Sequence, residues 1–283
     1  MSQLGVVCRE VSELGVVRAA KAFPFMLQVS FSEAVAYRAE FLVWMLSTTM
    51  PFVQMALMRT IAAEHPVVGA DRTYGPAEFT GYFLAALLVR MLTGAWVVWE
   101  MSQEIRTGAF SMRLLRPIHP FLSDASDNLA AIPMRGLLGI PIVVAMIVFS
   151  GGSTRVDPRL WLIAAATIAG AWLINFLVNC AMGCVAFFVE NATSVFEVWL
   201  ALWMIFSGYL FPLDLFPDWA RGILEVLPFR LMMDLPVRCI TGMITVHDAL
   251  MGMVQQWLWI GALFMAAGGM WRLGMRKFSA VGG

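Results

Sequence analysis

The chain has few charged residues. Only 13% of its 283 residues are Asp, Glu, Lys or Arg, whereas 60% are hydrophobic; an average globular domain has about 25% and 45–50%. A soluble core of this length cannot bury so much apolar surface, so lipid is the expected solvent, and disorder is excluded because it requires low hydrophobicity. Basic and acidic residues balance to a net charge of zero. Since nucleic-acid-binding domains carry a basic excess, no nucleic-acid partner is expected.

Residues that carry catalytic or metal chemistry are also scarce. The three histidines fall in separate loops, and the four cysteines include one close pair, Cys180 and Cys184, with no further ligand nearby. A structural zinc site needs four ligands, so we interpret this pair as packing residues, and Cys239 is expected alone in a polar loop. The motifs G-x-x-x-x-G-K-[ST], H-E-x-x-H and G-x-S-x-G are all missing. We therefore expect no enzyme, no catalytic, cofactor or metal site, and no ATP hydrolysis by this chain.

Long apolar runs dominate what is present. A helix of about 20 mostly apolar residues spans the roughly 30 Å hydrocarbon core of a bilayer. Six stretches satisfy this requirement, which predicts an all-α integral membrane protein with six transmembrane helices. They run approximately over Phe41–Met58, Phe79–Trp99, Leu129–Phe149, Leu160–Val189, Val195–Phe211 and Leu250–Trp271.

The positions of Lys and Arg predict the orientation, because cytoplasmic loops carry an excess of these residues. If the N-terminus is cytoplasmic, six crossings return the C-terminus to the same side. Eleven Lys and Arg residues then lie inside and seven outside. We therefore expect a multi-pass protein of the inner (plasma) membrane with both termini in the cytoplasm.

The two ends of the chain are expected to lie outside the spans. Residues 1–38 form the cytoplasmic N-terminus, in which Val11–Arg38 mixes apolar and charged residues. This pattern is typical of an amphipathic helix lying along the inner interface, and we expect Pro24 to interrupt it. Residues 276–283 form a cytoplasmic tail.

Residues 39–275 form the predicted transmembrane domain, which contains two notable connecting segments. Residues 100–127 are the longest cytoplasmic segment and predict two short helices separated at Gly108. Residues 212–248, on the outer side, are too apolar for a solvated loop. They predict a re-entrant helical hairpin, because non-helical backbone at membrane depth must be covered by protein or water.

Polar residues within the spans are candidates for a transport pathway. Arg90 is the one charge well inside a predicted span, where it costs roughly 2.5–3.5 kcal/mol on insertion scales. Its candidate partners near the inner surface are Glu100, Glu190 and Glu197. The alternative is that Arg90 snorkels inward or ties two helices together. Asn175 and Asn179 are one helical turn apart and are either pathway residues or interhelical hydrogen-bond donors.

Three short motifs, in this order and on these predicted sides, carry a family resemblance. Tyr37–Phe41, before the first span, is similar to Y-R-x-x-F, and Glu104–Gly108 with Leu114–Pro120 is similar to E-I-x-x-G…L-L-R-P. Around the outer hairpin, Ser207–Leu213 and Pro217–Phe229 are similar to S-G…F-P-L…P-x-W…L-P-F. With the layout over about residues 20–275, these motifs resemble the permease subunit of type-2 ABC exporters, the ABC-2 family.

The resemblance implies that a separate cytoplasmic ABC ATPase subunit, which uses ATP and Mg, powers transport. The residues implied in coupling to that subunit are Glu104, Arg106, Gly108, Arg113, Arg116 and Pro117. Those implied in an outer gate are Phe211, Pro212, Pro217, Trp219, Pro228 and Phe229. The chain itself would bind no cofactor.

The resemblance also implies a second permease chain, either identical or a paralogue, so that two copies embedded in the lipid bilayer line the translocation pathway. The 21 Met and 20 Phe residues favour efflux of a hydrophobic or amphipathic substrate, because such side chains repack around varied shapes. The alternative function is an ion-coupled secondary transporter or channel. That alternative would require inverted repeats and several midplane ionisable residues, of which Arg90 supplies one.

Overall fold

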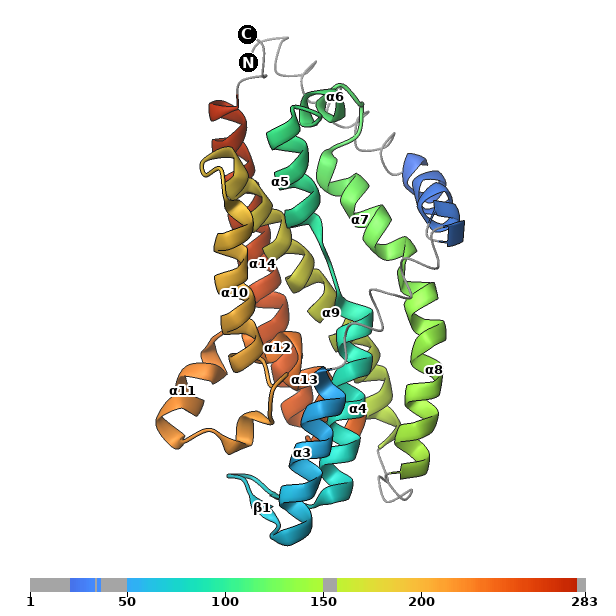
Figure 1. The fold of residues 1–283 in the computed structure, drawn as a ribbon, viewed down its shortest axis with the longest axis vertical. Coiled ribbons are helices and arrows are strands. Elements are labelled where there is room, and N and C mark those ends of the chain that lie inside the picture. Colours follow the sequence, from blue (N-terminus) through green and yellow to red (C-terminus); the bar gives the residue numbers. More distant parts are fainter. Residues whose placement is uncertain (1–20, 34, 37–49, 150–156, 279–283) are drawn as a thin grey trace.

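Helices account for nearly all regular structure in the computed structural model, which describes residues 21–33, 35–36, 50–149 and 157–278. They run mostly along one long axis (Figure 1). A helix covers residues 21–33. The further elements are α3 (Met50–Glu64), β1 (Val67–Val68), β2 (Thr73–Tyr74), α4 (Pro76–Thr93), α5 (Val97–Thr107), α6 (Phe110–Leu114), α7 (Pro120–Ala130), α8 (Ile132–Phe149), α9 (Pro158–Gly183), η1 (Cys184–Phe187), α10 (Ala192–Phe206), η2 (Leu213–Leu215), α11 (Asp218–Val226), α12 (Phe229–Met232), α13 (Asp234–Thr241) and α14 (Val246–Lys277).

Three helical stretches of the described residues are long and apolar enough to cross a membrane. They cover Pro76–Thr107, Pro158–Phe187 and Val246–Lys277. The apolar helix α10 is shorter, with 15 residues. The chain is therefore a mostly helical membrane protein, with about three long apolar helices. The number of six spans stays a prediction, since the first predicted span lies partly outside the described residues, which resume at Met50.

The second predicted span is not one continuous helix. It is α4 followed by α5, and the chain is extended at Gly94, where ψ is 138°. Glycine has low helix propensity. The carbonyls left free at the end of α4 receive hydrogen bonds from side chains of neighbouring helices: Nδ2 of Asn175 donates to the carbonyl of Thr93 at 2.6 Å. The apolar pattern of the predicted span does not reveal this break, because residues 95–99, which follow it within the span, are apolar as well.

The core is centred on α4, which packs against α3, α8, α9 and α13. Large side chains such as Phe79, Tyr82, Phe83 and Val89 are fully buried on several faces of this helix. A helix that is apolar all round is stable only when other helices surround it. The longest pair, α9 and α14, also packs closely: a Cβ at Gly170 would lie 2.3 Å from Oε1 of Gln256.

The outer segment contains η2, α11, α12 and α13, and two of its helices differ sharply in burial. α11 exposes Trp219 and Ile223, whereas nearly all of α13 is buried against α4 and α9. The expectation that Cys239 lies in a polar loop is wrong: it is a fully buried residue of α13, and burial raises the pKa of its thiol to about 11.

The helix over residues 21–33 lies beside α7 (Figure 1). Oγ of Ser30 donates to Oδ1 of Asp127 at 2.5 Å, which links the two helices. Pro24 does not interrupt the described helix, which is continuous over residues 21–33. The rest of the predicted amphipathic segment, up to residue 20, and the Tyr37–Phe41 motif lie outside the described residues.

Candidate functional sites: the coupling segment, the buried arginines and the outer network

The segment over residues 100–127 reverses the chain at the end of the bundle where α14 ends (Figure 1). Gly108 ends α5 in the left-handed conformation, with φ of 78°, and its N–H donates to the carbonyl of Ile105 at 3.3 Å. An L side chain costs roughly 1–2 kcal/mol in this conformation, so glycine is the residue that best permits the reversal. Pro117 then precedes α7, whose first residue is Pro120.

Arg113 holds this reversal together from inside. Its Nη1 donates to Oε2 of Glu104 at 2.8 Å, and its Nη2 donates to the carbonyl of Pro120 at 3.1 Å and to Oδ1 of Asp124. One guanidinium therefore joins α5, α6 and α7. Because the Arg113 side chain is only 11% exposed, it braces the segment and is not available as a free surface cation.

The short helix α6 has one anchored face and one free face. Phe110 is fully buried, with ring centroids 5.5 Å from Phe187 and 5.7 Å from Phe278. On the opposite side Met112 is 69% exposed and Leu115 is 77% exposed. The neighbouring residues Arg106, Arg116 and Pro117 are exposed as well. The result is an apolar and cationic surface presented at the tip of the bundle; we call it the coupling surface.

Asp124 makes the stability of this segment depend on pH. Its side chain is 1% exposed, and burial raises its pKa to about 6 although Arg113 opposes the shift. An unfolded Asp titrates at about 3.9, so between about pH 4 and 6 the folded chain holds a proton that the unfolded chain has released. Ionisation as the pH rises through this window therefore removes stability, on the order of 2–3 kcal/mol.

We predict that the wild-type chain loses this stability between about pH 4 and 6 relative to Asp124→Asn, whose amide does not titrate. Thermal unfolding midpoints of both chains over this pH range measure the difference. A wild-type chain that instead gained stability relative to the variant would show that attraction to Arg113 outweighs burial.

The polar residues predicted within the spans gather where α4 ends. Asn175 donates to Thr93, and Asn179 donates to the carbonyl of Asn175 at 3.0 Å, so both serve backbone carbonyls. Arg90 places its Cζ 4.9 Å from the ring centroid of Trp203 on α10. None of the three candidate glutamates forms an ion pair with Arg90 in the part of the chain that the structure describes.

Sequence reasoning did not single out Arg135 as a member of this group. It lies on α8, is buried, and donates Nη1 to the carbonyl of Gly94 at 2.8 Å. Its Cζ is 4.3 Å from the ring centroid of Trp96. The position of Arg135 near the start of an apolar run indicates only a helix end; its contact with α4 is visible only in three dimensions.

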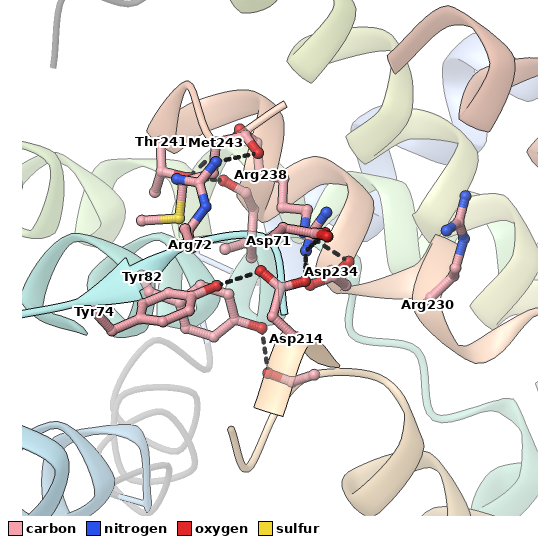
Figure 2. A network of polar contacts seen from close by, with 12 residues as sticks. Asp71, Arg72, Tyr74, Tyr82, Asp214, Arg230, Asp234, Arg238, Thr241 and Met243 are labelled. Atoms are coloured by element: carbon pink, nitrogen blue, oxygen red, sulfur yellow. Dashed lines mark hydrogen bonds and ion pairs between the residues drawn. The ribbon is translucent and has the colours of Figure 1, made fainter. Parts of the chain in front are cut away.

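Toward the opposite end of the bundle, Figure 2 shows a buried polar network that sequence reasoning also missed. Arg238 on α13 forms an ion pair with Asp214, and its Nε lies 3.2 Å from Oδ2 of Asp234. Oη of Tyr74 donates to the second oxygen of Asp214 at 2.7 Å. Both carboxylates are about 5% exposed. One arginine therefore neutralises one of two buried acids and joins β2, η2 and α13.

Three further residues, Tyr82, Gly208 and Ser207, close this network. Oη of Tyr82 on α4 donates to the carbonyl of Gly208 at 2.7 Å, and the N–H of Asp234 donates to the carbonyl of Ser207 at 3.1 Å. Gly208 has φ of 91°, and a Cβ there would lie 2.7 Å from Oη of Tyr82. The Ser207–Gly208 pair of the third motif therefore has a structural reason: only glycine permits this turn against Tyr82.

The residues implied in the outer gate are brought together only in part. The rings of Phe211 and Phe229 are connected through those of Phe216 and Phe206, and Phe229 is buried 4.8 Å from Trp199 on α10. Pro217 and Pro228 precede α11 and α12, and Pro212 precedes η2. Trp219 is exposed on α11. Three of these residues therefore start short helices, while Trp219 faces outward.

Comparison with known protein families relates the chain to a family of transporters. The sequence model of the family described as "ABC-2 family transporter protein" matches residues 76–282. The match covers most of the chain and includes the coupling surface, the buried arginines, and all of the outer network except Tyr74. A comparison with curated proteins gives no match.

Proposed function

Since the chain belongs to the ABC-2 family of transporter proteins, we propose that it is the permease subunit of an ATP-driven exporter, working with a second permease copy and a separate ATPase subunit. As a member of this family it is a membrane component of an ABC transporter, and such permeases pair with an ABC ATPase. Export, the pairing of two permeases, and a hydrophobic or amphipathic cargo are the further parts of the proposal.

The observation that carries the proposal is the coupling surface. Met112 and Leu115 are held out at the tip of the bundle, while the helix beneath them is fixed by Phe110 and by the ion pairs of Arg113. Exposed apolar side chains next to arginines are typical of a protein interface. Because α6 is fixed to the bundle in this way, a movement of the partner that shifts α6 would also shift the helices to which it is attached.

In this proposal the N-terminus, the C-terminus and the coupling surface lie in the cytoplasm, and the outer network lies on the other side. Arg272, Arg276 and Lys277 at the end of α14 support this orientation, because they lie at the same end as the coupling segment. The outer network would hold the external side closed until ATP binding moves the coupling segments. The proposal predicts cargo release at that side.

A docking experiment tests the proposed function. We expect Leu115→Asp to prevent the ATPase subunit from co-purifying with the chain from its native host, because a buried, unpaired carboxylate costs several kcal/mol at an apolar interface. Val68→Asp is the matched control: Val68 is 78% exposed, but lies on β1 at the opposite end of the bundle. Amounts of ATPase bound to the two variants and to wild type are compared.

Two results would contradict the proposal. One is an ATPase that binds Leu115→Asp as well as it binds wild type. The other is transport that persists when the ATPase is removed and an ion gradient is supplied, which would favour the secondary-transporter alternative.

A further inference from the structure

Two arginines, Arg90 and Arg135, lie close together, and neither forms an ion pair with a carboxylate of the described residues. Arg135 is 2% exposed; one of its terminal nitrogens donates to Gly94, and the other, Nη2, has no partner among the described residues. Arg90, one turn before Gly94, forms no ion pair with a described carboxylate. The positive charge of Arg90 also repels that of Arg135. Since buried charges are normally paired, two adjacent cations define a site that an anion would stabilise.

The end of α4 does not by itself account for both charges. A helix C-terminus carries the equivalent of about half a negative charge. Its free carbonyls already receive hydrogen bonds from Asn175 at Thr93 and from Arg135 at Gly94. Arg90 donates to none of them, and its guanidinium instead lies over the ring of Trp203. The second cation is therefore in excess of what capping of the helix requires.

The site lies near the inner ends of two apolar helices, α4 and α8. α4 has 18 residues and α8 has 18 residues, so each is about 27 Å long, close to the roughly 30 Å hydrocarbon core. Arg90 is in the last turn of α4 and Arg135 is in the first turn of α8, at the ends nearer the coupling segment (Figure 1). Trp96, 37% exposed, and Trp99 lie just beyond, as tryptophans do at membrane interfaces.

Arg90 connects the site to its surroundings. Its side chain is only partly buried, and Trp96, whose ring centroid lies 4.3 Å from Cζ of Arg135, is 37% exposed. An anion can therefore contact Arg90 directly, whereas it reaches the buried Nη2 of Arg135 only when the side chains that cover this atom move. A guanidinium offers several N–H donors in one plane, which suits the oxygens of a phosphate group.

We propose that Arg90 and Arg135, at the junction of α4 and α5, bind the phosphate group of an anionic amphiphile at the cytoplasmic surface of the bilayer. The side of the membrane rests on the proposed function and its orientation; the binding itself does not. The amphiphile is either a resident phospholipid or the exported molecule, and both present the same phosphate and acyl chain.

Lipid retention tests the binding. The full-length chain is placed in phosphatidylcholine nanodiscs with minor, equal amounts of phosphatidylglycerol and phosphatidylethanolamine, extracted into a neutral detergent, and analysed for bound lipid by native mass spectrometry. We expect wild type to retain phosphatidylglycerol over phosphatidylethanolamine. Arg90→Gln and Arg135→Gln should each reduce this preference about tenfold, the loss expected for one charge-assisted contact.

Arg272→Gln is the matched control, because Arg272 is an exposed arginine at the same end of the bundle, on α14, outside the junction. It should leave the preference unchanged. Arg90→Lys keeps the charge and should therefore retain part of the lipid preference that Arg90→Gln loses, a rescue that a purely structural role would not give. Equal retention of both lipids by wild type, or an equal loss in Arg272→Gln, would overturn the proposal.

Dodecyl phosphate distinguishes the two sources of the phosphate group. Added to wild type together with its ATPase, it should displace phosphatidylglycerol. Displacement with faster ATP hydrolysis assigns the site to cargo, and displacement without it assigns the site to a resident lipid. Failure to displace would contradict phosphate binding at the junction. Absence of any co-purifying ATPase would refute the proposed function, while the lipid preference would still be measured.

Discussion

Gly108→Pro is expected to abolish ATP-driven transport while the chain still inserts into the membrane. The residue has φ of 78° and donates its N–H to Ile105. Proline fixes φ near −65° and has no N–H, so the reversal between α5 and α6 cannot form, and Phe110 and Arg113 lose their placement. Transport of the cargo measures the effect. Before the cargo is identified, the measurement is the change in the rate of ATP hydrolysis by the ATPase subunit when it binds the permease.

Gly108→Asn is the control for this prediction, because asparagine tolerates the left-handed conformation better than other side chains. It should retain most of the activity, and Gly108→Ala should fall between the two. The ordering of the three variants follows backbone conformation alone. Normal coupling in Gly108→Pro would show that the reversal does not transmit movement.

Arg238→Ala is expected to lower the free energy of unfolding by about 3–5 kcal/mol, which is the usual cost of removing one partner from a buried ion pair. Asp214 and Asp234 would then be left buried without their cation. Burial already raises the pKa of Asp234, opposed mainly by Arg238. Without the arginine Asp234 holds its proton more tightly in the folded state, so the variant should lose stability as pH rises and recover part of it on acidification.

Arg221→Ala provides the comparison for this second prediction. Arg221 also pairs with an aspartate, but its partner Asp218 is 93% exposed on α11. Exposed pairs contribute about 0–1 kcal/mol, so this variant should unfold nearly like wild type. Chemical denaturation in mixed micelles, repeated at two pH values, measures both variants. Equal stability of Arg238→Ala and Arg221→Ala would mean that the outer network is solvated and not buried.

Composition and short motifs predicted a helical membrane protein of the ABC-2 family, and this is confirmed, since both depend on information local in the chain. Apolar length identifies α4, α9 and α14 because each segment must match a bilayer by itself. The glycine at position 108 was also predictable, because a reversal between two helices is a local requirement.

Contacts between distant segments were not predictable in the same way. Asp234 and Arg238 are four residues apart, so their pairing on one helix face can be inferred from spacing. Nothing local indicates that Asp214 and Tyr74 complete this network, or that Arg135 reaches Gly94. Arg113 illustrates the same limit: its motif suggests a surface cation, yet its charge is satisfied by acids on both flanking helices.

The outer network also constrains how the chain is made. Tyr74 and its partner Asp214 are 140 residues apart, and the cation that neutralises Asp214 comes 24 residues later still. During synthesis, β2 and α4 therefore enter the membrane long before the acids and the arginine that will surround them exist. Until α13 has emerged from the ribosome, Tyr74 and Tyr82 must remain hydrated or be sheltered by the insertion machinery. A ribosome that stalls before Arg238 would leave an inserted product whose outer network is incomplete. Quality-control proteases could recognise that product by its exposed, unfolded outer segment.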